Sequence, residues 1–501
     1  MRRVTKRLGI AVLMLLVLGV GGYGYYRHRN VPPQLAEPNW YTYYQQQDLV
    51  PHGKVGVLVT QLFMPETFRA EDYYNIALKA TQYIPWPVRA LAMRDRGVVL
   101  LDPARPYEFE SFQPKRLVDL HGSERDIDGI RYVEKLARGD VRWVPPDRRQ
   151  HLDHGYFLLT TRKSGFPTLA GKLMTKARLY YHDLGFVDHR LPHEAGMRAI
   201  AEASMARLQQ AHGPIPWRFA TADHFGLLEE AVDSLLDEGV ETLLIAPAAP
   251  VYSHHEEFNG GFRHAIADVR RWEARHGRKV KVILAPQLGD FAELREAFLA
   301  MLRDRLDTLP AGKETDVKIV VSMHGMPWDS VPHEAWLELA PPYRDGMLAD
   351  VRAVLAGYDF GRTEVVLSQD HFADPINNPK GRYLSTNQAF WDGIRARYDY
   401  VINLPIEFFA ENTDTMFSHA MFNFEGFPGF DRYERIDYSD WTVPYTREFL
   451  VEGTRVIYNG VPVGRYNAPI VEAHFRSMDS ILQRASSRPA AVAPEPVGAG
   501  G

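Results

Sequence analysis

Short runs of apolar residues alternate along the chain with longer stretches in which apolar residues recur every three or four positions. The short runs predict buried strands, and the periodic stretches predict amphipathic helices. The predicted strands are 55–60, 155–161, 216–220, 242–246, 279–285, 318–323, 364–368 and 400–404. The predicted helices are 194–211, 225–238, 261–276, 290–306, 342–356 and 385–397. This alternation predicts an α/β fold with parallel sheets covered on both faces.

Two pairs of segments resemble each other within the chain. Residues 56–65 (GVLVTQLFMP) are similar to 318–327 (KIVVSMHGMP), and 241–250 are similar to 399–408. Each segment is a strand that runs into a loop containing proline, and each half of the chain holds one of each kind in the same order. The pattern favours two related Rossmann-like halves that face each other across a cleft, although any two buried strands share part of it.

The two halves are expected at 54–310 and 311–483. A charged segment at about 95–154, rich in Asp, Pro and Arg, is interpreted as an insertion of surface hairpins and helix. Asn459-Gly460 is a strong hairpin-turn signal and predicts a hairpin in the C-terminal part of the second half. The segment 484–501 is rich in Pro, Ala and Gly and is expected to form a disordered tail.

The N-terminus predicts a membrane anchor. Residues 8–26 carry no charge, and as a helix they would extend ~28 Å, close to the ~30 Å of a bilayer core. A cleaved signal peptide is the alternative, but no clear cleavage site is present. Positive charges before the segment place residues 1–29 as a cytoplasmic tip and a single-pass anchor in the inner membrane, with the body in the periplasm. Residues 30–53 would be a linker or an arm that lies on the domain.

Composition excludes several classes of function. The chain has 501 residues and a net charge of −5, without a basic stripe, so nucleic acid is not an expected partner. It has no cysteine, which excludes disulfides, cysteine-bound metal and a thiol nucleophile. Phosphate-binding glycine loops, serine-hydrolase elbows and zinc-protease motifs are also absent. The oligomeric state is not predicted.

Several polar side chains follow predicted strands directly. His324 comes after 318–323, and Glu407, Glu411 and Asp414 lie in the loop after 400–404. The carboxyl ends of parallel strands are where α/β folds bind ligands, so these groups suit proton transfer or cation binding. The alternative is local: a histidine that satisfies a loop carbonyl, and an Asn412–Asp414 segment that caps a helix.

Two further stretches give weaker signals. His254 and His255 are adjacent, so they cannot both point into one site from a regular element. Asp370 and His371 follow the strand at 364–368 and add to the polar groups at the same edge.

Four motifs, in this order, resemble the ferrochelatase family. The strand and loop GVLVTQLFMPET (56–67) resemble that family's opening strand and Pro-Glu-Thr loop. PAAPVYS (247–253) is similar to its Pro-x-x-Pro-Gln-Tyr-Ser segment, and SMHGMP (322–327) to its Ser-Ala-His-Gly-Leu-Pro. PIEFFAENTDTM (405–416) aligns without a gap on its Pro-Ile-x-Phe-x-Ser-Glu-His-Ile-Glu-Thr-Leu. The resemblance covers about 54–420, apart from the insertion.

The resemblance implies insertion of a divalent metal, most simply Fe2+, into a porphyrin or another tetrapyrrole, as in haem biosynthesis. The metal is a substrate, and no permanently bound cofactor is expected. His324 would be the base or metal ligand, Asp414 the second metal ligand and Glu411 a further acidic partner. The residues implied for tetrapyrrole binding are Phe63, Tyr252, Ser253, Trp328 and Asn412.

Two departures from the family pattern leave other functions open. Asn412 stands where the family has histidine, and Leu62-Phe63 replace a polar or glycine pair. Asparagine can coordinate a metal or donate a hydrogen bond, but it cannot shuttle a proton. A non-catalytic envelope protein that binds a tetrapyrrole or metal is therefore the main alternative, and a structural scaffold is the other.

Overall fold

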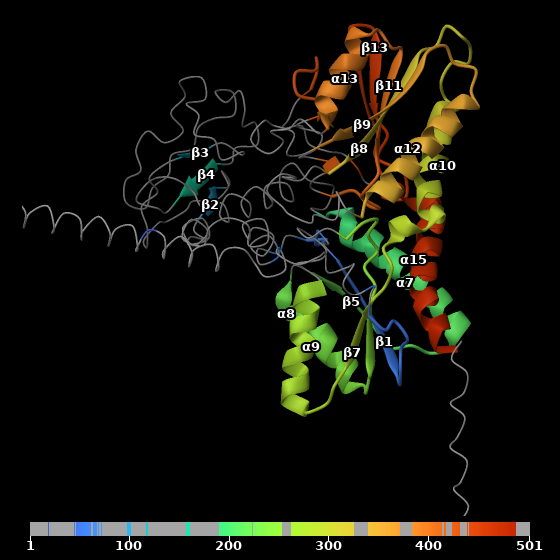
Figure 1. Cartoon of the computed structure of the whole chain (residues 1–501). Helices are drawn as coiled ribbons and strands as arrows, with labels where there is room; N and C mark the ends of the chain where they lie inside the picture. Colours follow the sequence, from blue (N-terminus) through green and yellow to red (C-terminus); the bar gives the residue numbers. More distant parts are fainter. Residues whose placement is uncertain are drawn as a thin grey trace, which may run out of the picture.

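The chain folds into two main sheets, parallel in all but one strand pair and joined by helices, and a separate small antiparallel sheet, as Figure 1 shows. The computed structural model describes residues 19, 45, 47–61, 64–67, 69, 72, 98–101, 117–118, 157–160, 190–222, 224–252, 262–324, 339–370, 383–412, 415–416, 423–430, 438 and 440–486. The predicted α/β class with parallel sheets is confirmed within these residues.

The first sheet has the strand order β5-β1-β6-β7, and all its pairs are parallel. Its strands are β1 (Val55–Gln61), β5 (Trp217–Thr221), β6 (Thr242–Ile245) and β7 (Lys281–Leu284). On one face lie α8 (Phe225–Asp237) and α9 (Arg263–His276), whose apolar residues form a core with Leu58, Leu243 and Ile245. Because α9 ends at Gly277 in the left-handed conformation (φ 66°), the chain can turn directly back into β7.

The second sheet has the order β10-β9-β8-β11-β13-β12, and only the β12–β13 pair is antiparallel. Its strands are β8 (Val317–Met323), β9 (Thr363–Gln369), β10 (Leu384–Ser385), β11 (Tyr400–Pro405), β12 (Arg447–Val451) and β13 (Thr454–Tyr458). Every residue of β8 is buried, as expected for a central strand covered on both faces. The covering helices are α12 (Pro341–Ala356) and α13 (Thr386–Arg395), and Ser385 caps α13 by accepting from Gln388 N (3.1 Å).

Three helices connect the two sheets: α7 (Pro192–His212), α10 (Ala292–Leu306) and α15 (Asn467–Ser486). In α7, Met197 lies in the core of the second sheet, whereas Met205 lies in a core of the first. The same change of sheet occurs along α15, between Ile470 and Met478. These two helices run side by side in Figure 1, and Ser204 Oγ lies 3.4 Å from Val471 O.

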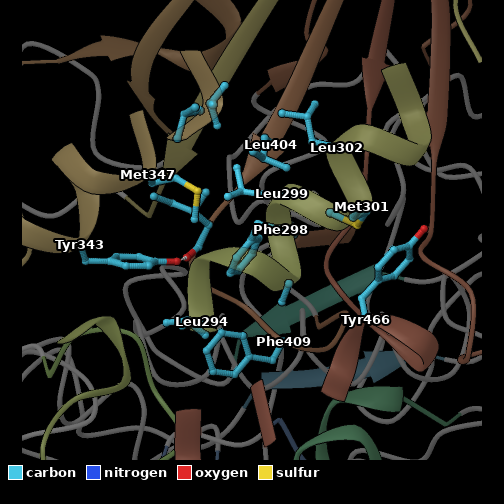
Figure 2. Packing of buried hydrophobic residues seen from close by; sticks show 14 of the residues in the cluster. Leu294, Phe298, Leu299, Met301, Leu302, Tyr343, Met347, Leu404, Phe409 and Tyr466 are labelled. Carbon is cyan, nitrogen blue, oxygen red and sulfur yellow. Dashed lines mark hydrogen bonds between the residues drawn. The ribbon is translucent and has the colours of Figure 1, made fainter. Parts of the chain in front are cut away.

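The largest core cluster fills the space between α10, α12 and the second sheet (Figure 2). Phe298 of α10 and Phe409 of the loop after β11 pack with ring centroids 6.3 Å apart. Tyr343 of α12 is buried, and its hydroxyl donates to Ile406 O (2.6 Å). Two short 3-10 helices lie next to α10. One, η4 (Leu288–Asp290), precedes α10 in the sequence, and the other, η6 (Gly464–Tyr466), contacts it in space.

The prediction of a hairpin around Asn459-Gly460 is wrong. The hairpin is instead β12–β13, and its turn is Glu452-Gly453, both with positive φ (53° and 93°). Two consecutive positive φ values match the twist of a tight hairpin. Asn459-Gly460 follows β13, and the chain then enters η6 without a second strand. A local turn signal is present at both sites. The hairpin forms at Glu452-Gly453 because β13, which follows that turn, pairs in parallel with β11.

Other expectations are met only in part. The strand expected at 155–161 forms as β4 (Phe157–Thr160), but it pairs antiparallel with β2 (Val98–Leu101) and β3 (Leu117–Val118) in a separate sheet. Most of the insertion expected at 95–154 lies outside the described residues, apart from β2 and β3.

Of the expected linker or arm at 30–53, the structure describes residues 45 and 47–53, and these contact the first sheet. There His52 N donates to Thr242 Oγ1 (3.0 Å), and Gln45 Nε2 donates to Leu284 O (3.1 Å). Helix α15 extends through Ser486, and the rest of the expected tail is outside the described residues.

Among the residues that the structure describes, no helix combines the length and apolar character needed to cross a bilayer. The predicted anchor at 8–26 lies outside them except for Gly19.

Candidate functional site at the strand ends

His324 follows β8 at the carboxyl edge of the second sheet. It lies between the ends of β9 and β11, because β8 pairs with both strands in parallel. Its residue is only 9% exposed, and its backbone N–H donates to Glu407 Oε2 in the loop after β11. The structure therefore brings together two of the strand ends that the sequence singled out.

A second histidine, His193, approaches the same loop from the first half. The ring of Phe408 lies edge-on to His324 (centroids 6.4 Å apart) and to His193 (6.5 Å). His193 stands in the first turn of α7 and is buried, and its Nδ1 accepts a hydrogen bond from Met64 N (2.9 Å). Phe408 thus contacts two imidazoles that come from different halves of the chain.

Burial fixes the protonation of His193. It lowers the pKa of this imidazole to about 3, so the ring is neutral near pH 7. Because Nδ1 accepts from Met64 N, the ring proton is on Nε2. No sequence pattern selects His193, since it belongs to no motif. The only available signal was its place directly after the Leu-Pro pair that starts a helix.

The loop after β1, with its Met-Pro-Glu-Thr stretch, is held by the start of α7. Glu66 N donates to Glu194 Oε2 (3.0 Å), and Leu191 N donates to Glu66 O (2.9 Å). On its other side α7 meets the loop after β11: a Cβ atom on Gly196 would lie 2.8 Å from Cβ of Ala410. Glycine therefore permits the close contact between α7 and the loop that carries Glu407 and Glu411.

A buried polar network extends beneath His324 across three strands. Asn403 Nδ2 donates to Ser322 Oγ (2.9 Å), and Asp370 Oδ1 accepts from Thr386 Oγ1 (2.6 Å) and Asn423 Nδ2 (3.0 Å). Burial raises the pKa of Asp370 to about 6, while hydrogen bonds from Thr386, Asn423 and Ser322 and the charge of His324 oppose the rise. Asp370 is thus a carboxyl group that titrates close to neutrality beside His324.

Glu411 is the second buried carboxyl group at this edge. Its Oε2 accepts from Thr415 Oγ1 (2.6 Å) and Tyr458 OH (3.3 Å), and its Oε1 accepts from Val461 N (3.2 Å). Burial raises its pKa to about 7, although these three hydrogen bonds pull the pKa down. Burial raises the pKa of Tyr458, and the charges of Glu411 and Asp370 raise it further, which places this phenol near both carboxyl groups.

Asn412 takes part in a helix cap and does not lie on an open surface. Its side-chain Oδ1 accepts from Thr415 N (3.0 Å), and its backbone N–H donates to Thr415 Oγ1 (2.9 Å). The residue is fully buried. This is the reciprocal arrangement of a helix-capping pair, and it agrees with the local alternative for Asn412.

Tyr252 lies in the core of the first half. Its residue is 1% exposed, and its hydroxyl donates to the carbonyl oxygens of Pro247 (3.3 Å) and Pro286 (3.4 Å). The remaining residues predicted for the site lie outside the described residues; these are Phe63, Ser253, Trp328 and Asp414, together with Leu62, His254, His255 and His371.

No set of three His, Asp or Glu side chains within the described part of the chain is arranged to hold a metal ion. Of the predicted metal ligands, His324 is described and Asp414 is not. What the described residues place at this edge is a group of titratable side chains: neutral His193, His324, and two buried carboxyl groups whose pKa values lie near neutrality.

Comparison with known proteins identifies a family over part of the chain. Residues 174–421 match the Ferrochelatase family. The match begins after the insertion and includes β5 to β11 with the loop that follows it, and it supports the chelatase family for this part of the chain. No curated protein matches the sequence.

Among solved structures, SirB from Bacillus subtilis with Fe3+ is 8% identical, with a TM-score of 0.34 over 58% of this chain and 92% of SirB. The Cra transcriptional regulator from Pseudomonas putida, in complex with fructose 1-phosphate, is 13% identical. It has a TM-score of 0.21 over 56% of this chain and 88% of its own. A solute-binding protein from Burkholderia graminis, in complex with D-arabinose, is 10% identical. Its TM-score is 0.19 over 41% of this chain and 61% of its own.

Proposed function

We propose, from the Ferrochelatase match over residues 174–421, that this protein is a chelatase that inserts Fe2+ into a porphyrin or related tetrapyrrole for haem biosynthesis. The match supports insertion of a metal into a tetrapyrrole in general; the metal, the macrocycle and the pathway belong to the proposal. The observation that carries it is the position of His324, at the end of a central parallel strand and beside a loop that packs against the other half.

The reaction needs groups that accept protons. A divalent metal enters a porphyrin only when two pyrrole N–H protons leave, so the site requires two acceptors or one acceptor and a path to solvent. His324 would take a pyrrole proton or bind the incoming metal. Glu411, with a pKa of about 7, is ionised in part at neutral pH and can accept a proton. Asp414 would be the second metal ligand.

The tetrapyrrole would contact residues at the junction of the two halves. The sequence assigns this contact to Phe63, Tyr252, Ser253, Trp328 and Asn412. Among them, Tyr252 and Asn412 are buried and engaged with neighbouring groups, so their contribution would be to shape the surrounding loops. The membrane anchor at 1–29 and a periplasmic location of the body belong to the same proposal.

A non-catalytic binder of a tetrapyrrole or metal is the second candidate, and one observation favours it. At the position where the resemblance expects a titratable histidine, Asn412 is committed to a cap with Thr415 and has no proton to transfer. Binding needs only a suitable surface, whereas insertion needs proton acceptors.

The test is metal insertion by the full-length protein. Protoporphyrin and Fe2+ or Zn2+ are mixed with the protein without oxygen, and the absorbance spectrum is followed with time. Insertion faster than in the protein-free blank, at least tenfold slower in His324→Ala, supports catalysis. A shifted but static spectrum supports the binder, and no change supports the scaffold.

The matched control is His276→Ala. This histidine is exposed at the end of α9 in the first half, so its loss removes an imidazole far from the strand ends. Insertion is expected to be unchanged in this variant. Equal rates in wild type and His324→Ala would contradict the catalytic assignment.

A further inference from the structure

A second cavity lies away from His324, between α10 and the segment that leads into β12. Its volume is about 680 Å³, within the range of small-molecule sites. Met301 and Arg305 of α10, Val443, Asn459 and Tyr466 line it. Figure 2 shows Met301 and Tyr466 together at one end of the largest core cluster. His324, Glu411 and Asn412 are not part of its lining.

Asn459 is one of the residues that line this cavity, and its buried amide has an unused donor. The residue is 2% exposed, and its Oδ1 accepts from Arg305 Nε (2.8 Å). A guanidinium group only donates, so the amide oxygen must face Arg305 and the amide nitrogen must point elsewhere. Nδ2 has no hydrogen-bond partner among the residues that the structure describes. A buried donor without a partner destabilises the fold, and a bound acceptor would remove this cost.

The charge within the cavity is positive at its inner end. The side chain of Arg305 is 19% exposed and lies 3.5 Å from Glu448, whose side chain is more exposed at 43%. Arg465 is at the rim, where it pairs with Asp304 (2.6 Å). The most buried cation therefore lies next to the unused amide donor, whereas carboxylates are at the solvent side.

Two glycines allow close contact beside the cavity. Gly460 and Gly464 have positive φ values (75° and 59°), and a Cβ atom on either would collide with backbone of the segment before β12, at Tyr445 O and Thr442 O respectively. The chain after β13 and the segment before β12 can lie in contact only because both positions are glycine. This contact keeps Val443 over the cavity.

We propose that this cavity binds a small organic acid. Its carboxylate would accept hydrogen bonds from Arg305 and from Nδ2 of Asn459, and its apolar part would lie against Met301, Val443 and Tyr466. An acid of this kind satisfies the unused donor and the buried cation together, which neither a neutral apolar molecule nor a cation does. The cavity shares no lining residue with the strand-end site, so ligand binding here can be tested separately from metal insertion.

Calorimetric titration of the full-length protein tests the site with three probes. Benzoate carries both a carboxylate and an apolar ring, acetate lacks the ring, and benzyl alcohol lacks the charge. Benzoate is expected to bind at least about tenfold more tightly than either of the other two. Absence of benzoate binding up to about 10 mM would overturn the proposal.

Three variants locate the binding. Asn459→Asp keeps an oxygen for Arg305 and replaces the donor by a second, repelling oxygen, and Val443→Trp fills the cavity. Each is expected to weaken benzoate binding at least about tenfold. Leu450→Trp is the matched control, because Leu450 is exposed on β12 outside the cavity lining. Unchanged binding in both Asn459→Asp and Val443→Trp would place benzoate elsewhere and overturn the proposal, as would equal loss in Leu450→Trp.

Discussion

Replacing Glu411 by glutamine should make the protein more stable at high pH. Burial raises the pKa of this carboxyl group from 4.5 to about 7, so the folded state binds its proton more tightly than the unfolded state. The contribution of the protonated group is fully present below pH 4.5. It is lost as pH rises through 7, where the folded state must hold a buried charge.

The difference between the two pKa values corresponds to about 3 kcal/mol at pH 8. Glutamine is never charged, and its amide oxygen can still accept from Val461 N. The melting temperature of Glu411→Gln is therefore expected to exceed that of the wild type at pH 8 by roughly 3–5 °C. At pH 4.5 the two proteins should melt at nearly the same temperature.

The assay is thermal unfolding followed by circular dichroism, at half-unit steps from pH 4.5 to pH 8. The control is Glu202→Gln, which removes an exposed carboxylate from α7. The refuting result is a difference between wild type and Glu411→Gln that does not change with pH. A wild type more stable than the variant at pH 8 would refute it too, because the three hydrogen bonds would then outweigh burial of the charge.

Two further predictions concern the packing around this edge. Gly196→Val should lower the melting temperature, since its side chain would collide with Ala410 and overpacking costs ~1–3 kcal/mol; Gly226→Ala, whose Cβ has only ordinary contacts, should not. An unchanged melting temperature in Gly196→Val would contradict the close contact. Thr386→Val should cost ~1–3 kcal/mol because it removes a donor from buried Asp370, whereas Thr386→Ser keeps the hydroxyl and should restore most of the stability; equal losses in both would show that the methyl group matters instead.

The strands were the most predictable part of the fold. Runs such as 318–323 and 400–404 are mainly apolar, and β8 and β11 form there with their ends within one residue of the predicted ones. Burial on both faces leaves such a run few alternatives to a central strand. The hairpin was predictable in kind but not in place, because Asn459-Gly460 and Glu452-Gly453 both suit a tight turn and tertiary pairing selects between them.

The site was predictable where one residue follows a strand, as His324 does. It was less predictable where function depends on a contact between distant segments. His193 reaches Phe408 and Met64 only through the packing of α7 on two loops, and no local pattern encodes this contact. Asn412 shows the converse: its neighbour Thr415 was visible in the sequence, but only the structure shows that they cap each other.

The path of α15 has a consequence for the order in which the chain becomes native. Ile470 packs in the second half, whereas Met478, Ile481 and Leu482 complete the core under the first sheet. The first half therefore has an unfilled apolar face until residues 478–482 have been synthesised. Until then, the strands of the first half stay exposed or are protected by a chaperone. A truncation before residue 467 would leave the cores of both halves incomplete and would not release one intact domain.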